Sequence, residues 1–316
     1  MDDFDFGDFD PVEAEERTTR SRQLQQYCAG ALQIAAAVER VFVLFPQFGA
    51  CLAACDRAFQ LSRTLNTPQG ILIKGEPGSG KTTVAKYFIR SLPQSDLFDH
   101  GFGALLIRLR TAPTTAQAVG AMLRAVKYPF TSVKRTNVHT MRDIAFESIQ
   151  HHGTRIIFID QAHSLSYQAG QKRKDVNETT VSDLLVELMD QTGVSLCLLA
   201  DANFTRLEDV APALASRVTV REALSEFRND EYWAGFLCAF ARQAKAIALD
   251  CLTLPDIQQR TYTATMGNRR RFRRLIVEAV LIASDGGAAA VAKEHLARAF
   301  ALVTGTASEA PNPYVA

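Results

Sequence analysis

The chain has 316 residues, of which 47% are hydrophobic, and a formal net charge of +1. This length and composition predict one large or two smaller globular domains with a substantial core. No apolar run reaches the roughly 18 residues of a membrane helix, and the acidic N-terminus argues against a secretory signal or a transit peptide. Six scattered cysteines without a C-x-x-C pair, including Cys51 and Cys55, indicate buried thiols in a cytoplasmic protein and not metal ligands.

The first residues form an acidic tail. Residues 1–16 contain eight acidic residues and no basic one, and Phe4, Phe6 and Phe9 alternate with aspartates. Such a segment buries too little apolar surface to offset the entropy cost of ordering, so disorder is predicted for residues 1–20. The tail could be a docking peptide, mimic nucleic acid or have no role. The remainder is basic overall, which suits a polyanion such as duplex DNA but also an ordinary solvated surface.

A lead-in of helix, extended segment and helix, at residues 18–38, 41–46 and 48–65, precedes a short buried strand at residues 71–73. The next residues match the phosphate-binding pattern G-x-x-x-x-G-K-[ST] and open a further helix. A glycine-rich turn between strand and helix directs backbone N–H groups and the helix dipole at phosphate. The predicted ATP-binding residues are Gly75, Glu76, Pro77, Gly78, Ser79, Gly80, Lys81, Thr82 and Thr83. We expect Lys81 to reach the β- and γ-phosphates and the Thr82 hydroxyl to hold Mg²⁺.

Four more apolar runs alternate with helical patterns along the chain. The predicted strands are residues 104–109, 155–159, 195–199 and 218–220. Together with the first strand they predict an α/β domain over residues 21–221, with a five-stranded parallel sheet covered by helices on both faces. Only helical periodicity follows, which predicts a small all-helical lid over residues 222–306. The proline-containing end, residues 307–316, is expected to be loose.

The second half of the nucleotide site is predicted at Asp160, which ends the strand Ile156–Ile159 and would hold Mg²⁺ through its water shell. P-loop ATPases usually carry a glutamate at the next position, but here it is Gln161. An amide cannot accept a proton from water, and loss of a general base typically costs about 10²–10⁴ in rate. Three interpretations remain open: a natural weak hydrolase that uses ATP as a switch, another base such as His163, or a native glutamate replaced to trap the ATP state.

Two further residues suit hydrolysis. Asn203, at the tip of the strand over 195–199, could orient the lytic water, with Asp201 as the second choice and helix capping as the competing interpretation. Arg217 precedes the last strand, where an arginine can contact the γ-phosphate of a neighbouring subunit, although it could also be a surface residue.

Basic residues cluster at two places. Five arginines lie within residues 269–274, at the start of a predicted helix, and Arg270 is expected to fold back onto the nucleotide. The candidates for phosphate contacts to DNA are Arg269, Arg271, Lys172, Arg173 and Lys174. A solvated surface is the competing interpretation for both groups.

Taken in order, the phosphate loop, the Asp160 motif, Arg217 and the Gly-Asn-x-Arg helix start resemble the AAA+ ATPases over about residues 40–305. Within them, the extended lead-in, the Asp-x-Ala-His motif and Leu-Ala-Ser-Arg at 214–217 are similar to the transposition regulators TniB and TnsC, and more distantly MuB.

The resemblance implies an ATP- and Mg²⁺-dependent ATPase that forms a ring or filament on duplex DNA, with Arg217 completing the site of the next copy. It also implies recruitment of a transposase and a TniQ-like target-selection protein. The alternatives are a replication initiator or helicase loader, for which no winged-helix pattern is seen, and a nucleotide-gated scaffold with little hydrolysis. A secretion-associated ATPase has no supporting segment.

Overall fold

The computed structural model describes residues 27–65, 68–92, 103–166, 180–204, 206–305 and 311–315. The acidic tail and the predicted DNA contacts Lys172, Arg173 and Lys174 lie outside the described residues. The chain divides into two compact units. The helical unit comprises residues 1–43, 234–264 and 272–316, and the α/β unit comprises residues 44–233 and 265–271.

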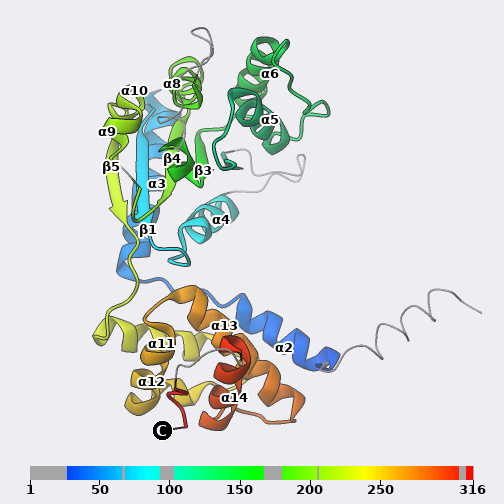
Figure 1. The fold of residues 1–316 in the computed structure, drawn as a ribbon, viewed down its shortest axis with the longest axis vertical. Coiled ribbons are helices and arrows are strands. Elements are labelled where there is room, and N and C mark those ends of the chain that lie inside the picture. Colours follow the sequence, from blue (N-terminus) through cyan, green and yellow to red (C-terminus); the bar gives the residue numbers. More distant parts are fainter. Residues whose placement is uncertain are drawn as a thin grey trace, which may run out of the picture. The chain divides into compact units, whose positions relative to one another are not determined.

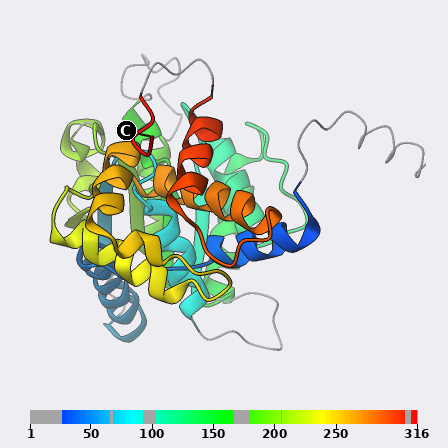
Figure 2. The same ribbon diagram turned by 90° about the horizontal axis from the view of Figure 1, so that it is seen from below.

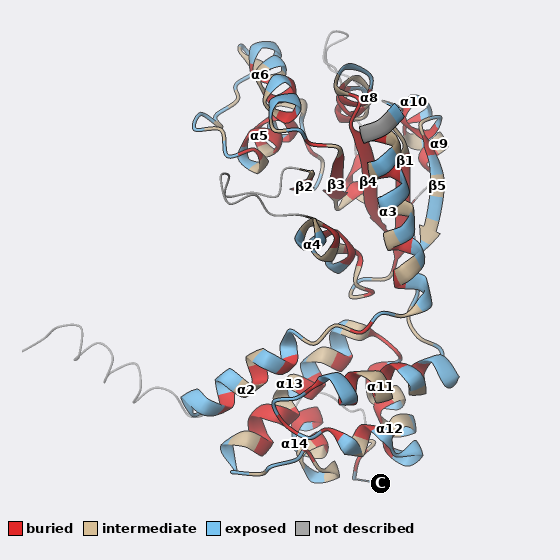
Figure 3. Ribbon diagram, turned by 180° about the vertical axis from the view of Figure 1, so that it is seen from behind, coloured by how far each residue is buried: buried red, intermediate tan, exposed pale blue. Residues whose placement is uncertain are grey.

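The α/β unit is built on a five-stranded parallel sheet in the order β2-β3-β4-β1-β5 (Figure 1). The strands are β1 (Gly70–Gly75), β2 (Ala104–Arg108), β3 (Ile156–Asp160), β4 (Ser195–Asp201) and β5 (Val218–Ala223). This confirms the predicted fold class. The three central strands β1, β3 and β4 are almost entirely buried, because helices cover both faces of the sheet (Figure 3).

Among the described residues, two helices cover one face of the sheet and five cover the other. The first two are α3 (Pro46–Leu65) and α4 (Lys81–Ser91), and Phe88 of α4 packs 5.6 Å from Phe158 of β3, measured between ring centroids. The others are α5 (Thr115–Ala125), α6 (Val138–His151), α8 (Val181–Thr192), α9 (Leu207–Val210) and α10 (Pro212–Ala215). Capping boxes start α5 at Thr114 and α8 at Thr180, which explains why these helices begin where they do.

The strand register places several polar residues at the carboxyl edge of the sheet. Gly75 at the end of β1 lies opposite Asp201 of β4, and Asp160 at the end of β3 lies opposite Arg108 of β2. Ligands of open parallel sheets bind outside this edge. The fold therefore brings residues from four separate stretches of the sequence together at the edge of the sheet where the phosphate loop begins.

The helical unit packs around aromatic side chains. Its helices, in blue and in yellow to red in Figure 2, are α2 (Ala29–Glu39), α11 (Glu231–Gln243), α12 (Pro255–Thr265), α13 (Arg269–Asp285) and α14 (Lys293–Thr304), of which α11, α12 and α13 each have an end in the α/β unit. The rings of Phe236 and Phe240 lie 5.4 and 5.1 Å from that of Phe272, which is 1% exposed. Such edge-to-face contacts stabilise the unit beyond the area that they bury.

Two boundaries differ from those expected from the sequence. Helix α2 belongs to the helical unit and not to the nucleotide-binding domain, since Tyr27 donates to Glu278 of α13 and Arg273 donates to the carbonyl of Val41 at 2.8 Å. The end of the chain is also less loose than expected. Tyr314 is 2% exposed, and its hydroxyl donates to Thr261 at 3.0 Å.

Cys51 and Cys55 are fully buried, as expected, and so is Cys197. Within the described ranges, none of the helices is long and apolar enough to cross a membrane.

Candidate nucleotide site

The phosphate loop, residues 75–82, joins β1 to α4 with two glycines in the left-handed region. Gly78 has φ 90° and Gly80 has φ 97°, a conformation that other residues rarely adopt. A Cβ atom at Gly78 would also lie 2.7 Å from the side-chain oxygen of Asn268, so the loop has no room for a larger residue there. The sequence pattern therefore corresponds to a real backbone requirement, and the turn leads directly into the N-terminus of α4.

Lys81 lies within this loop. Its Nζ donates to the carbonyls of Gly75 at 2.6 Å and Glu76 at 3.0 Å, and it lies 3.4 Å from Oδ1 of Asp201. The side chain is only 9% exposed, and burial lowers the pKa of its ammonium group, while Asp201, Asp160 and Glu76 act in the opposite direction. The neighbouring Ser79 hydroxyl is buried and has no hydrogen-bond partner among the described residues. A buried cation beside an unsatisfied hydroxyl fits a loop that receives phosphate oxygens.

Thr82 and Asp160 form the candidate Mg²⁺ site. The Thr82 hydroxyl donates to Oδ2 of Asp160 at 3.1 Å, and the backbone N–H of Gln161 donates to Oδ1 of the same carboxylate at 3.0 Å. Hydroxyl and carboxylate oxygens are ligands that Mg²⁺ prefers, with the rest coming from water and nucleotide phosphates. In the part of the chain that the structure describes, no group of three or more His, Cys, Asp or Glu residues could hold a metal by itself.

Gln161 has a left-handed backbone, with φ 62°, and its side chain contacts the end of β2. In the amide orientation that satisfies both groups, its nitrogen donates to the carbonyl of Leu109 at 2.7 Å and its oxygen accepts from Arg108 at 2.7 Å. Both polar atoms of the side chain are thereby engaged. Arg108 is a site residue that the sequence analysis missed, because only its register opposite Asp160 brings it here.

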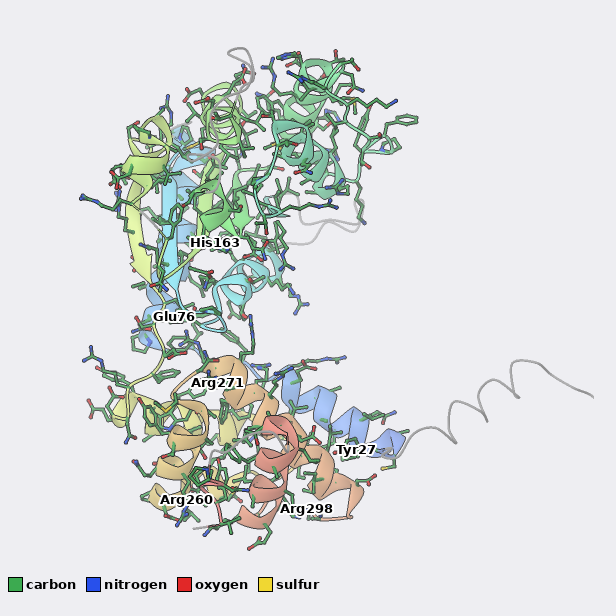
Figure 4. All side chains as sticks on the ribbon, in the orientation of Figure 1. Tyr27, Glu76, His163, Arg260, Arg271 and Arg298 are labelled. Carbon is green, nitrogen blue, oxygen red and sulfur yellow. The ribbon has the colours of Figure 1, made fainter. Side chains whose placement is uncertain are left out.

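Asp201, the second choice of the sequence analysis, is the β4 residue that contacts Lys81. Its other carboxylate oxygen lies 3.6 Å from Nδ1 of His163. Asn203 is exposed on the turn after β4 and makes no described contact with Lys81, Asp160 or Gln161, so its role stays a prediction. His163 and Glu76, labelled in Figure 4, come from the turn after β3 and from the phosphate loop.

The first turn of α13 is tied to the phosphate loop by Asn268. Its amide nitrogen donates to the carbonyl of Pro77 at 3.0 Å, and its oxygen caps the helix by accepting from the N–H groups of Arg270 and Arg271 at 3.0 and 3.1 Å. The Cβ atom of Arg270 lies close to Gly78, and its side chain is exposed. The contact between Arg270 and the nucleotide stays a prediction, which the closeness of the Arg270 Cβ atom to Gly78 favours.

Arg269 is not available for DNA, which corrects its assignment from the sequence. Its guanidinium lies over the rings of Phe45 and Phe227, at 4.5 and 5.3 Å from their centroids, and donates to the carbonyls of Ser79 and Ser225. Burial lowers the pKa of this arginine to about 10. The aromatic side chains and the loop carbonyls therefore hold Arg269 on the phosphate loop, whereas Arg271 is exposed (Figure 4).

A basic and aromatic surface between α5 and α6 was also missed. Phe130 is 72% exposed at the tip of this connection, with Tyr128 at 6.2 Å between ring centroids. Four exposed basic residues lie close to it in the sequence, namely Arg124, Lys127, Lys134 and Arg135. A cleft of about 310 Å³ beside it is lined by Arg108, Arg110 and Arg124, among others. The signal in the sequence was the alternation of basic and aromatic residues over 124–135.

Arg217 lies at the opposite, amino edge of the sheet. Its carbonyl accepts from the N–H of Gly70, the first residue of β1, at 2.9 Å. Its guanidinium donates to both carboxylate oxygens of Asp190, at 2.9 and 2.7 Å, and to the carbonyl of Ala213 at 2.9 Å. The whole length of β1, about 17 Å, separates this backbone from the phosphate loop at Gly75.

Comparison with known proteins agrees with this geometry. Residues 64–207 match a family model described as an AAA domain. No curated protein sequence matches the chain.

Two structures from Aeropyrum pernix are similar. The Aeropyrum pernix ORC2 protein in ADPNP–ADP complexes has a TM-score of 0.62 at 14% identity, covering 87% of this chain and 72% of that one. The Aeropyrum pernix ORC1 protein in complex with DNA has a TM-score of 0.60 at 18% identity, covering 85% and 69%.

The Drosophila ORC bound to DNA is also similar, with a TM-score of 0.54 at 15% identity and coverage of 94% and 75%. At these identities the similarity shows a shared fold. The resemblance to TniB and TnsC remains a prediction.

Proposed function

Since residues 64–207 match a family model described as an AAA domain and the fold is that of P-loop AAA+ proteins, we propose that this protein is an ATP-dependent, DNA-binding regulator of transposition that assembles on duplex DNA. In this proposal ATP and Mg²⁺ bind at the carboxyl edge of the sheet, and each nucleotide is shared between two copies of the chain.

The position of Arg217 is the observation that carries the proposal. The guanidinium lies at the amino edge of the sheet, one strand length from the phosphate loop of its own chain. An arginine side chain cannot span that distance, so Arg217 can meet a γ-phosphate only in another copy. Arginines supplied in trans stabilise the charge of phosphoryl transfer.

The nucleotide contacts follow from the geometry of the loop. Lys81 would exchange its carbonyl contacts for phosphate oxygens, and Thr82 and Asp160 would hold Mg²⁺. The ion would offset charge on the phosphates. Asp201 keeps the ammonium group of Lys81 at the edge of the sheet. Gln161, engaged by Arg108, supplies no base, which favours retention of ATP over turnover.

Duplex DNA is the proposed polyanion. The exposed basic residues around Phe130 provide a positive surface on the α/β unit, and such surfaces bind the phosphate backbone in a salt-dependent manner. The similar ORC structures include two with DNA, which supports the same partner here.

The further proposed partners are a transposase and a TniQ-like target-selection protein, which the resemblance to TniB and TnsC implies. Similarity to the ORC structures favours a second candidate, a replication initiator or helicase loader. Both candidates need the same ATP site and the same trans arginine, and they differ in the protein recruited.

Mass photometry and electron microscopy of the full chain, with and without ATP and duplex DNA, test the assembly. We expect rings or filaments only with ATP, and their loss in Lys81→Ala and Arg217→Ala. Particles of monomer mass under every condition would reject self-assembly. Co-sedimentation of DNA-bound protein with a transposase or with a replicative helicase then separates the two candidates.

A further inference from the structure

The hydrogen bonds that Arg217 makes with the described residues use only part of its guanidinium. Nε and Nη2 donate to the two oxygens of Asp190, and Nη1 donates to the carbonyl of Ala213. A guanidinium has five N–H bonds, and these contacts use three of them. The two that remain, one on Nη1 and one on Nη2, have no acceptor among the described residues, and both belong to the Nη1–Nη2 end of the group.

This end is one of the two edges of a guanidinium that can bind phosphate or carboxylate oxygens in a bidentate manner. Asp190 occupies the side of the guanidinium, so it orients Arg217 without blocking that end. The pair is half-exposed, with 34% of the Arg217 side chain and 50% of the Asp190 side chain accessible.

Backbone hydrogen bonds hold the main chain from which the Arg217 side chain extends. The N–H of Arg217 donates to the carbonyl of Leu214 at 3.0 Å, and its carbonyl receives the N–H of Gly70. Asp190 lies in the last turn of α8, where the helix dipole disfavours a carboxylate. The negative charge of Asp190 is therefore stabilised by Arg217 and not by its own helix. Arg217 is thus held in the turn between α10 and β5, and Asp190 is held in α8.

We propose that Asp190 is a positioning residue, which holds Arg217 so that its open end meets the γ-phosphate bound by the neighbouring copy. This inference rests on the proposed function, in which ATP lies between copies. Without Asp190 the long side chain would sample many rotamers, and few of them would present two N–H groups together.

A mixing experiment with two variants tests the trans contact first. The donor carries Lys81→Ala, which removes its own nucleotide site but leaves Arg217. The acceptor carries Arg217→Ala and keeps an intact phosphate loop. Dissociation of a fluorescent ATP analogue from the acceptor is followed by stopped flow on duplex DNA, and we expect the donor to slow it.

Asp190→Asn is then added to either the donor or the acceptor. In the donor we expect dissociation to become about tenfold faster, because charge-assisted bonds to Arg217 are lost. In the acceptor we expect no change. Glu187→Gln is the matched control, since Glu187 lies on the same helix and pairs with Arg142 at 3.0 Å, and in the donor it should leave the rate unchanged.

The outcomes distinguish the shared nucleotide site from the positioning role of Asp190. If the donor does not slow dissociation at all, the proposed shared site fails. If the donor slows dissociation and Asp190→Asn in it has no effect, the role of Asp190 is rejected while the shared site stands. Slower dissociation would mean that Asp190 sequesters Arg217, and equal effects in donor and acceptor would mean a role in folding; either result overturns the inference.

Discussion

At the scale of single residues, Gln161 and Arg108 bear on whether the proposed ATPase site can activate water. The Gln161 amide uses its oxygen for Arg108 and its nitrogen for Leu109, at the edge where Asp160 ends β3. A glutamate at position 161 would supply a carboxylate base and would face the same guanidinium. Whether the site offers a proton acceptor to water therefore depends on the group at position 161.

We predict that Gln161→Glu raises ATP turnover by about 10²-fold, since it restores a general base. The measurement is steady-state phosphate release by the full chain with duplex DNA. A ratio near one would show that residue 161 does not limit hydrolysis, and a loss of turnover in His163→Ala would then identify His163 as the alternative base.

Arg269 provides a second prediction at this scale. Arg269→Ala removes contacts with two aromatic rings and two loop carbonyls, so we expect the free energy of unfolding to fall by about 2 kcal/mol. Arg271→Ala is the exposed control and should change it little. Urea denaturation of both variants is the measurement, and equal effects would contradict the buried role of Arg269.

At the scale of elements, the start of α13 couples helix capping to the phosphate loop through Asn268. Asn268→Ala should lower both the stability, by about 1 kcal/mol, and the affinity for nucleotide. Asn268→Ser retains a side-chain oxygen that can cap the helix but lacks the amide that donates to Pro77 and Glu226. We therefore expect it to keep more of the stability than Asn268→Ala does and to lose affinity to the same extent, measured by denaturation and by titration with a fluorescent ATP analogue. A loss of stability in Asn268→Ser as large as that in Asn268→Ala would contradict separate roles.

Helix α2 is joined to α13 by the bond from Tyr27 to Glu278. Burial, helped by Glu278, raises the pKa of Tyr27 from its ordinary value near 10 to about 12. The unfolded chain thus loses this proton first, so the contribution of Tyr27 to stability is complete below pH 10 and is lost as pH rises towards 12. We predict that Tyr27→Phe flattens the decline of stability over this range, measured by urea denaturation at successive pH values. An unchanged decline would mean that other groups cause it.

At the scale of the whole molecule, DNA binding should depend on the exposed basic residues near Phe130. We predict that Lys127→Ala reduces the slope of log affinity against log salt by about 0.9, as expected for one lost phosphate contact. Lys245→Ala, an exposed lysine of the helical unit, is the control and should leave the slope unchanged. Fluorescence anisotropy with random-sequence duplex DNA is the measurement, and equal slopes for all three proteins would reject this surface.

The sequence predicted the parallel sheet and the phosphate loop because both leave local patterns, namely short apolar runs and spaced glycines. It did not reveal Arg108 or the burial of Arg269, since those depend on strand register and on aromatic side chains distant in the chain. It also misjudged the end of the chain, because two prolines suggest a loose end. In the structure, Tyr314 is buried and bonded to Thr261, and Asn312 donates to the carbonyl of Ala297. Local chemistry was thus predictable, and contacts between distant segments were not.

The location of Arg217 and the phosphate loop at opposite edges gives any assembly of this chain a direction. In the proposed assembly each copy would offer an arginine on one side and a nucleotide on the other, so contacts would run head to tail. A closed ring would have every nucleotide capped, whereas an open filament would leave one bare nucleotide at a single end. Nucleotide exchange and loss of subunits would then start from that end alone. The position of a copy along the filament would therefore reflect when it was added.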